Sequence, residues 1–349
     1  MTVLSKKPKF AVLGTGNSGQ AFAADITLKG YSVNLAEVPE FEATLRAIEK
    51  KGGIEMSGEA ANGFARPNML TTDLKAAIKG VDIIIIGGSA FAHEPFSKAL
   101  AHDFEDGQFI LFTSNFGALR FHNWMQEAGV TTRATPVESM SLLYATRAVE
   151  PGVVACIGVK NSLPVAALPA ERTLEFLDLI QPVFPQFTAA ENVWLTSVNN
   201  LNPIVHPPMV LFNAGRIEAT GGQGWNLYAD GATESVAKVM LAMDAERMAL
   251  LAPLSDGGIA FKDAFEELYE DYSLGKKAFP KPSDKVRSTA TRLFRRRPRL
   301  TRAMSTRICP LVWPPGRPSA ACGEFPRPIS MRWFGSPRPC WDAIISLKG

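Results

Sequence analysis

Short apolar runs alternate with amphipathic segments along the first half of the chain. The runs at 10–13, 81–88 and 109–114 are strand-sized, and the four isoleucines at 83–86 leave no polar position between them. Unbroken apolar runs are typical of parallel strands that are buried on both faces of a sheet. Segments of helical period lie between the runs. The pattern therefore predicts an α/β fold, a doubly wound parallel-sheet Rossmann domain over residues 1–187.

The pattern changes after Pro185. The segment at 193–219 mixes polar and apolar positions around a Pro-Pro pair, whereas those at 235–254 and 261–272 have the period of helices. Residues 188–286 are therefore predicted to form an all-α domain that follows the Rossmann domain. Residues 287–349 have neither period and are treated as a separate basic, Pro/Arg-rich tail.

A glycine-rich turn follows the first predicted strand. Gly14, Gly16 and Gly19 form a GxGxxG motif at the start of a predicted helix, and a second strand then leads to Glu37. Glycine at these positions allows a tight turn, close approach of the backbone to a pyrophosphate, and close packing of the helix on the sheet. The motif in this setting predicts a dinucleotide site, and its alternative is a glycine turn that binds no ligand.

Glu37 and the ends of later strands extend this predicted site. A carboxylate at the end of the second strand can accept a ribose hydroxyl and repels a 2′-phosphate, so we expect NAD to be preferred, with NADP as the alternative. The predicted cofactor-binding residues are Gly14, Gly16, Asn17, Ser18, Gly19, Glu37, Ser89, His93 and Asn115. For His93, the alternative is a residue at the start of a helix that touches no ligand.

A polar cluster marks the start of the predicted helical domain. His206 is the only histidine beyond the first domain, and asparagines surround it at 199, 200, 202 and 213. A lone histidine among apolar residues is usually a core residue, but several asparagines and a Pro-Pro pair suit the wall of a cleft. We therefore consider His206 a candidate general acid/base. Asn202, Asn213, Arg147 and Arg216 are the candidate substrate-binding residues.

Charge and cysteine content divide the chain in the same place. The net charge is +3, but residues 287–349 hold twelve Arg and one Lys against two acidic residues, which gives +11 there and −8 over residues 1–286. Three of the four cysteines lie in the tail. No export signal, membrane-length apolar run or metal-ligand spacing is present, so we expect a cytoplasmic protein with no membrane partner and no metal. Oligomeric state is not indicated.

Several segments together resemble the opine (octopine/nopaline) dehydrogenases, from about Phe10 to about Tyr272. The resemblance rests on the segments VLGTGNSGQAFA, GIEMSGEAANG, DIIIIGGSAFAH, ESMSLLYATR, GVVACIGVKNSLPVAALPA and NNLNPIVHPPMVLFNAGRIE. The last of these is the most specific, because it joins an Asn-rich helix, a His-Pro pair and Asn-Ala-Gly.

The resemblance implies a reductive condensation. An amino acid and a 2-oxo acid form an imine, NADH reduces it to a secondary-amine dicarboxylate, and the histidine at position 206 serves as acid/base. Glycerol-3-phosphate dehydrogenase and ketopantoate reductase share the architecture but use a lysine, and no lysine lies in the Asn/His cluster. Another alternative is a non-catalytic NAD-binding protein whose basic tail binds anions. The tail lacks a helical charge stripe, so nucleic acid is not an expected partner.

The tail departs from the family pattern. The family carries a carboxylate beside the histidine in a C-terminal segment like RYV-x-EDxPxGL, but here no Asp or Glu lies between Asp284 and Glu324. A shifted reading frame, with permitted codons, turns residues 302–328 into RYVDEDMPLGLAPWAAIGRLWGVPTP. We therefore expect residues from about Arg287 onward to be an out-of-frame translation. This chain should then bind NADH but turn over poorly.

Overall fold

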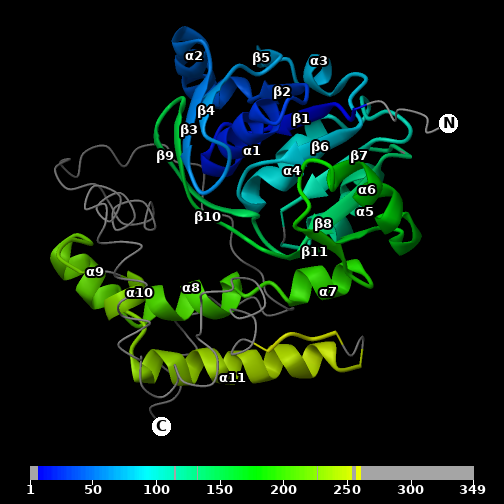
Figure 1. The fold of residues 1–349 in the computed structure, drawn as a ribbon. Coiled ribbons are helices and arrows are strands. Elements are labelled where there is room, and N and C mark those ends of the chain that lie inside the picture. The colour runs from blue at the N-terminus through cyan, green and yellow to red at the C-terminus, as the bar shows by residue number, and fades with distance from the viewer. Residues whose placement is uncertain (1–6, 114, 132, 226, 254–256, 261–349) are drawn as a thin grey trace. The chain divides into compact units, whose positions relative to one another are not determined.

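The computed structural model describes residues 7–113, 115–131, 133–225, 227–253 and 257–260. Its main element is an eight-stranded sheet with the strand order β12-β11-β8-β7-β6-β1-β2-β5 (Figure 1). Neighbouring strands are parallel except for β8 and β11, which are antiparallel. The strands are β1 (Phe10–Leu13), β2 (Val33–Ala36), β5 (Met69–Thr71), β6 (Ile83–Ile86), β7 (Phe109–Phe112), β8 (Thr135–Ser139), β11 (Leu163–Ala167) and β12 (Phe187–Ala189).

Helices cover both faces of this sheet, as the alternating sequence pattern predicts. One face packs against α1 (Asn17–Leu28), α2 (Glu42–Lys51) and α6 (Thr173–Ile180). The other packs against α3 (Leu74–Ile78), α4 (Ala90–Ala99) and α5 (Gly117–Glu127). Short 3-10 turns precede α2 and α6, at Pro39–Phe41 and Ala170–Arg172.

The isoleucine run shows why the strands have no polar positions. Ile83 and Ile85 are fully buried in the hydrophobic core on one face, and Ile84 and Ile86 are buried in the core on the other. Each residue of β6 therefore removes apolar surface from water, which is the main favourable term in folding. The doubly wound parallel sheet predicted from the sequence is confirmed, although its edge at β11 is antiparallel.

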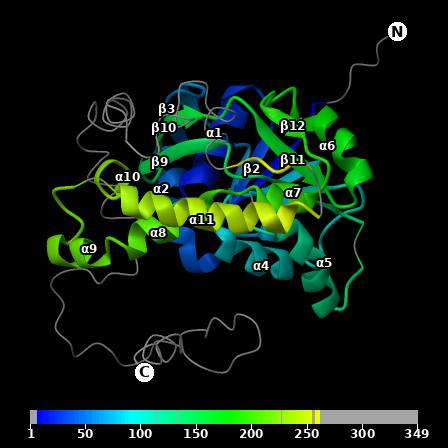
Figure 2. The same cartoon turned by 90° about the horizontal axis from the view of Figure 1, so that it is seen from below.

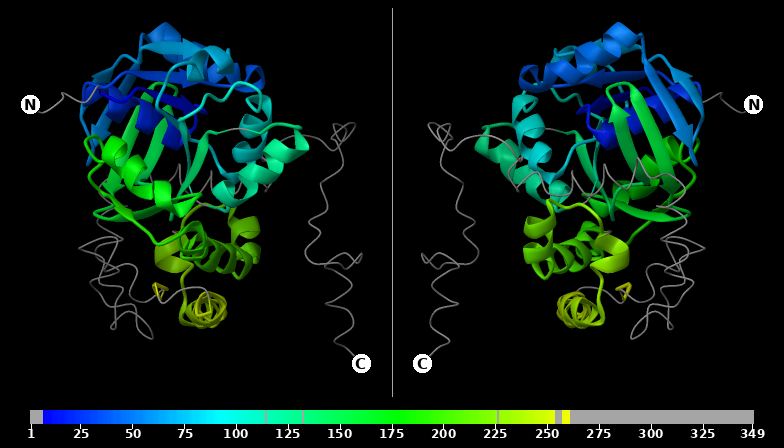
Figure 3. Two further views of the ribbon diagram at one scale, coloured as in Figure 1. Left: turned by 90° about the vertical axis from the view of Figure 1, so that its right-hand side faces the viewer. Right: turned by 90° about the vertical axis from the view of Figure 1, so that its left-hand side faces the viewer.

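A second, four-stranded sheet was not predicted. Its order is β4-β3-β10-β9, and its strands are β3 (Ile54–Gly58), β4 (Gly63–Ala65), β9 (Tyr144–Glu150) and β10 (Val153–Val159). These strands pair side by side, and this sheet faces the viewer in the right-hand view of Figure 3. The sheet packs on α1, and buried residues such as Val154 share a core with Phe22 of that helix. Helix α1 therefore lies between two sheets.

The described residues after β12 are mainly helical, as predicted. The helices are α7 (Val193–Val198), α8 (Asn202–Leu211), α9 (Ala214–Thr220), α10 (Leu227–Asp230) and α11 (Glu234–Leu251). Helix α7 packs on β8 and β11, and α8 and α11 lie side by side (Figure 2). A small apolar core joins Ile204 and Met209 of α8 to Val236 and Met240 of α11. The predicted helix at 261–272 and the tail at 287–349 lie outside the described residues.

Two helices break the rules on which the sequence prediction rested. Helix α4 begins at Ala90 and continues to Ala99, so Pro95 lies inside it. Helix α8 contains Pro207 and Pro208, which were expected to disfavour a helix. Neither proline can donate an N–H, so the carbonyls of Pro203 and Ile204 receive no helical hydrogen bond from them.

Within the described residues, no helix is both long and apolar enough to cross a membrane. The same part of the chain contains no cluster of His, Cys, Asp and Glu side chains that would suit a metal ion.

Close backbone packing fixes the start of α1 on the sheet. A Cβ added to Gly19 would lie 1.8 Å from the carbonyl oxygen of Gly14, whereas one added to Gly16 would meet nothing within 4 Å. Gly14 itself has a φ of +102°, which disfavours any side chain. The three glycines of the motif therefore have different structural roles, and of the three only Gly16 borders open space.

We expect Gly19→Ala to lower the free energy of unfolding by about 1–3 kcal/mol, because the backbone atoms that it meets cannot move aside without shifting the helix. Gly16→Ser is the matched control. Its side chain enters open space at a helix N-cap, so stability should change by less than about 0.5 kcal/mol. Urea denaturation of both variants tests this expectation, and equal losses would contradict it.

Candidate active site

The N-terminus of α1 presents backbone N–H groups to the open space beside Gly16. Its N-cap residue is Gly16, and no side chain among the described residues caps it. The unsatisfied N–H groups of a first helical turn and the positive end of the helix together favour an anion. Because a Cβ at Gly16 would be unobstructed while Gly19 is packed tightly, the turn has the shape that a pyrophosphate needs.

Glu37 holds this glycine turn from the end of β2. It is 7% exposed, and its Oε2 accepts hydrogen bonds from the Thr15 N–H at 2.7 Å and the Thr15 hydroxyl at 2.8 Å. Its Oε1 accepts the Val38 N–H at 3.0 Å, which leaves that oxygen able to accept one further donor. The contact of Glu37 with a ribose hydroxyl stays a prediction. Glu37 also fixes Thr15, a structural role that the sequence did not indicate.

Asn17 and Gln20 attach the start of α1 to the second sheet. The Oδ1 of Asn17 accepts the Ala148 N–H of β9 at 2.8 Å, and the Oε1 of Gln20 accepts the Gly152 N–H at 2.8 Å. The side-chain oxygen of Asn17 thus has a structural partner, and the predicted cofactor contact of Asn17 stays a prediction. Ser18 is buried at 9% exposure.

Ser89 and His93 follow the end of β6 but differ in exposure. Ser89 is exposed at the N-cap of α4, and no side-chain hydrogen bond caps that helix. His93 is 1% exposed and packs edge-on against Phe112, with ring centroids 5.2 Å apart. Burial, and to a lesser extent the charge of Arg120, lowers the pKa of His93 to about 4, so its ring is neutral. This inward position gives no support to a cofactor contact by His93, which stays a prediction.

The turn after β7 is strained. Asn115 and Phe116 both have positive φ values, 70° and 62°, in the left-handed region that non-glycine residues seldom adopt. Each such residue costs on the order of 1–3 kcal/mol unless its surroundings hold it. The Nδ2 of Asn200, a buried residue just after α7, donates to the Oδ1 of Asn115 at 3.0 Å. Asn115 therefore lies where the sheet meets the helical part.

Glu138, at the end of β8, is a buried carboxylate beside the same turn. It accepts the N–H groups of Phe116 at 3.3 Å and Ala118 at 3.1 Å, and the hydroxyl of Ser197 on α7. Burial raises the pKa of Glu138 to about 7, although the hydrogen bonds from Ser197 and from the backbone amides at 116–118 act in the opposite direction. The sequence analysis missed this residue. The available signal was an acid in a strand, TPVES, that is buried throughout.

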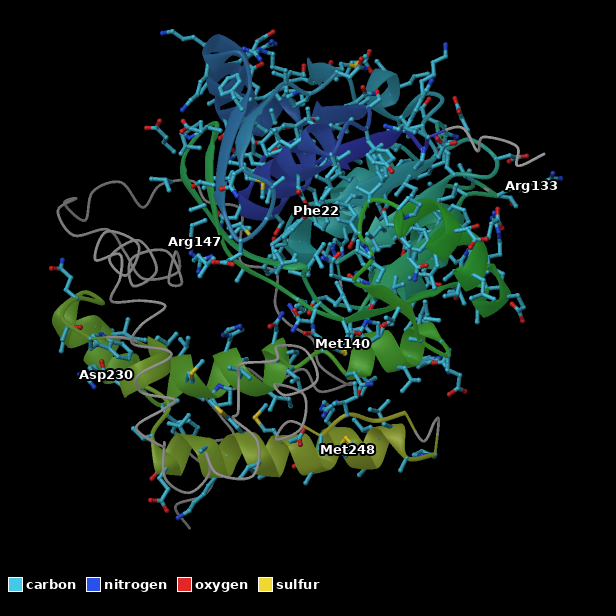
Figure 4. The ribbon with its side chains drawn as sticks, viewed as in Figure 1. Phe22, Arg133, Met140, Arg147, Asp230 and Met248 are labelled. Atoms are coloured by element: carbon cyan, nitrogen blue, oxygen red, sulfur yellow. The ribbon has the colours of Figure 1, made fainter. Side chains whose placement is uncertain are left out.

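His206 and Arg147 come within electrostatic reach of each other. His206 is half-buried on α8, and Arg147 is half-buried on β9, where its Nη1 donates to the Thr146 carbonyl (Figure 4). Burial, and then the positive charge of Arg147, lowers the pKa of His206. A neutral imidazole beside a guanidinium suits proton transfer on a substrate that carries a carboxylate.

The other candidate substrate residues lie elsewhere or have other partners. Asn202 is exposed at the first turn of α8, where its N–H donates to the Oδ1 of Asn200. The Nδ2 of Asn213 donates to the carbonyls of Met209 and Gly231, which joins α8 to α10. Arg216 is exposed and stacks on Trp225 with its guanidinium 4.9 Å from the ring centroid. Arg147 is the candidate whose charge, after burial, lowers the pKa of His206.

A buried arginine of α11, paired with an aspartate of the same helix, ties α11 to the end of α7. The guanidinium of Arg247 donates to Asp244 Oδ1, at 3.0 Å from Nε and 2.6 Å from Nη2, and to Asn199 Oδ1 at 2.9 Å. Asn199 also accepts the Ile259 N–H and donates to the Gly257 carbonyl. Asn199, which the sequence placed in the polar cluster, is therefore structural.

We expect Glu138→Gln to gain stability over the wild type as the pH rises. Because its pKa is about 7 in the folded protein against 4.5 ordinarily, Glu138 stabilises the fold fully below 4.5 and loses that contribution as the pH passes 7. The total loss is on the order of 3 kcal/mol. Glutamine does not titrate, so urea denaturation from about pH 5 to about pH 8 should show a growing difference in favour of the variant.

Glu175→Gln is the matched control for this series. The pKa of Glu175 is lowered, chiefly by its hydrogen bond from Arg172, so its contribution to stability is lost at low pH instead. A difference that stays flat for Glu138→Gln, or that grows equally for both variants, would contradict the buried titration.

Comparisons with known proteins agree with this geometry. A family model described as the NAD/NADP octopine/nopaline dehydrogenase, alpha-helical domain, matches residues 189–305. An opine dehydrogenase of Arthrobacter sp. (strain 1C) is 36% identical over 243 residues, which cover 69% of this chain and 66% of that protein, just under two thirds of its length. A vitopine synthase of Allorhizobium ampelinum is 26% identical over 286 residues, 76% of this chain and 77% of that protein.

Solved structures show the same fold at lower sequence identity. Octopine dehydrogenase with NADH and pyruvate matches 77% of this chain and 74% of its own, with a TM-score of 0.60 and 21% identity. A ketopantoate reductase from Ralstonia eutropha JMP134 matches 70% of this chain and 74% of its own, with a TM-score of 0.52 and 16% identity. The Rossmann domain with a following helical domain is thus shared by both enzyme classes, and the family model and the curated relative support the opine dehydrogenase family for this chain.

Proposed function

We propose that this protein is a nicotinamide-dependent opine dehydrogenase, which condenses an amino acid with a 2-oxo acid and reduces the resulting imine. The observation that carries the proposal is that the half-buried His206 on α8 lies within electrostatic reach of Arg147 on β9. An imidazole that can transfer a proton, within reach of a guanidinium, suits a reaction between two carboxylate-bearing substrates. The match to the opine dehydrogenase family supports the same chemistry.

The glycine turn supports a dinucleotide as cofactor. Its open face at Gly16 and the uncapped N-terminus of α1 suit the pyrophosphate, and the exposed Ser89 and the Asn115 side chain suit contacts nearer the nicotinamide. When bound, the reduced nicotinamide supplies the hydride. The Glu37 carboxylate at the end of β2 disfavours a 2′-phosphate, so NADH is the preferred form and NADPH the alternative.

The residues of this chain would act on the substrates as follows. Arg147 would bind the carboxylate of one substrate through a charge-assisted hydrogen bond. The amine of the amino acid adds to the keto carbon and water then leaves, which gives the imine. His206, whose lowered pKa keeps it neutral, would take the proton that the attacking amine releases and return it to the departing oxygen. Asn202, Asn213 and Arg216 remain predicted substrate contacts.

The substrate class follows the ligands of related structures. Octopine dehydrogenase has been solved with NADH and pyruvate, with NADH and L-arginine, and with NADH and agmatine. We therefore assign this chain a small 2-oxo acid and an amino acid as its substrates.

The activity of this chain depends on its tail. The family model ends its match at residue 305, and residues 285–323 contain no acidic side chain where the family carries the carboxylate that accompanies the histidine. We propose that residues from about Arg287 onward are translated out of frame and that turnover is impaired as a result. The step from a net charge of −8 to +11 at this point supports the proposal.

We expect His206→Asn to abolish opine formation while leaving NADH binding unchanged. Loss of general acid/base catalysis lowers turnover by about 10²–10⁴-fold, whereas a residue away from the nucleotide does not alter its dissociation constant. His122→Asn, at an exposed histidine on α5, is the matched control and should match the wild type in both measurements. NADH fluorescence titration and chromatographic detection of the secondary-amine product provide the data. The assays use a chain in which the residues from about 287 onward are restored to the frame that encodes the family segment. Impaired turnover of the printed chain then does not hide the effect of the substitution.

Sequencing the coding DNA from the Lys276 codon past the stop codon tests the frame proposal. We expect one base to be inserted or lost near Arg287 and the other frame to encode the DEDMP segment. Restoring that frame should raise opine formation by at least about 10-fold, because the imidazole regains its orienting carboxylate. DNA that encodes this tail with no family segment in another frame would contradict the proposal.

A further inference from the structure

Two consecutive residues at the carboxyl end of β7 need outside support. Asn115 and Phe116 both have left-handed φ values, and the ring of Phe116 is 41% exposed, so its own packing does little to hold the turn. Strained backbone persists only where neighbouring groups over-determine it, and it concentrates at functional sites. This turn lies at the edge of the sheet where doubly wound folds bind their ligands.

The Glu138 carboxylate supplies that support from the neighbouring strand. Its two oxygens accept the N–H groups of Phe116 and Ala118, at the N-terminus of α5, where Phe116 is the N-cap residue and no side chain of its own helix caps it. A carboxylate at a helix N-terminus also interacts favourably with the helix dipole. Glu138 is fully buried, so water does not compete for these bonds.

The same carboxylate reaches the helical part of the chain. Ser197 of α7 donates its hydroxyl to Glu138, and Asn200, one turn later, donates to Asn115. The Oδ1 of Asn200 then accepts the Asn202 N–H at the start of α8, the helix that carries His206. Two neighbouring hydrogen bonds, from Ser197 to Glu138 and from Asn200 to Asn115, therefore connect the strained turn to the segment that leads into α8, which carries His206.

We propose that Glu138 is a positioning residue that holds the Asn115–Phe116 turn in its strained conformation and fixes Asn115 relative to α8. Glu138 itself touches neither cofactor nor substrate in this assignment. Its effect on NADH binding passes through Asn115 and so rests on the proposed function, whereas its effect on the turn does not. A carboxylate with a merely structural role would stabilise the fold without altering NADH binding or the conformation of the turn.

The experiment compares Glu138→Ala, Glu138→Gln and Phe116→Gly, alone and combined, in the full chain. Gln108→Ala is the matched control, because Gln108 is buried, makes three hydrogen bonds and lies at the opposite end of β7. Two quantities are measured: the NADH dissociation constant by fluorescence titration, and amide hydrogen exchange of a peptide that covers residues 115–119.

We expect Glu138→Ala to raise the NADH dissociation constant by about 10-fold and to speed exchange at 115–119, because the turn relaxes once its acceptor is gone. Glutamine keeps one acceptor oxygen, so Glu138→Gln should restore most of the affinity. Glycine adopts positive φ without strain, so Phe116→Gly should reduce the effect of Glu138→Ala to less than about half in the double-mutant cycle. Gln108→Ala should lower the melting temperature and leave both readouts unchanged.

The outcomes separate the two proposals. Failure of the wild-type chain to bind NADH would refute the proposed function, and the exchange at 115–119 would still decide the role of Glu138. Wild-type affinity and wild-type exchange in Glu138→Ala would overturn the positioning role. So would an equal change in Gln108→Ala, which would show a general loss of stability. If Glu138→Ala does not fold, Glu138→Gln decides from exchange, because glutamine loses one of the two acceptor oxygens. A smaller rise in exchange at 115–119 that Phe116→Gly reduces supports the positioning role, and wild-type exchange overturns it.

Discussion

The burial of the central sheet on both faces is the constraint from which the arrangement of this molecule follows. Strands such as β6 and β7 carry apolar side chains on each face, so they have no place for a polar functional group. Polar side chains can therefore gather only where the strands end. Glu37 after β2, Asn115 after β7 and Glu138 at the end of β8 all lie at such ends. The position of the candidate site at the strand ends therefore follows from the burial of the sheet on both faces.

Putting polar groups at the ends of buried strands has an energetic consequence, because each must find partners without water. Glu37 accepts two hydrogen bonds from Thr15 of the turn that it holds and one from the Val38 N–H, and Glu138 accepts bonds from a helix N-terminus and a serine. A buried acceptor without such donors costs about 1–3 kcal/mol, and more when charged. The two carboxylates thus shape the backbone around them, since the N–H groups that satisfy them belong to the turns of the site.

The sequence predicted those features that periodicity and glycine spacing determine. The strands at 10–13 and 83–86, the helix after the glycine motif and the helical character beyond Pro185 all follow from local pattern. The second sheet did not, because its strands have mixed burial and pair across long separations, as β10 does with β3. Helix α8 was doubtful because Pro207 and Pro208 contradict helix propensity. Glu138 was missed because a single acid in a strand has meaning only when its tertiary partners, Phe116 and Ser197, are known.

The electrostatics of His206 connect the described part of the chain to the tail. Burial and the charge of Arg147 both lower the pKa of His206, so the imidazole favours its neutral form. A neutral imidazole is ready to accept a proton. To return that proton during the reaction, His206 must first become an imidazolium, and the free energy of protonation must therefore be small. A nearby carboxylate raises the pKa of an imidazole, and so does the carboxylate of a substrate that neutralises Arg147. An acidic C-terminal segment and a bound 2-oxo acid would therefore act on His206 in the same direction. Residues 285–323 contain no acidic side chain, so under the proposed function the carboxylate of the substrate would have to raise the pKa of His206 without one from this segment.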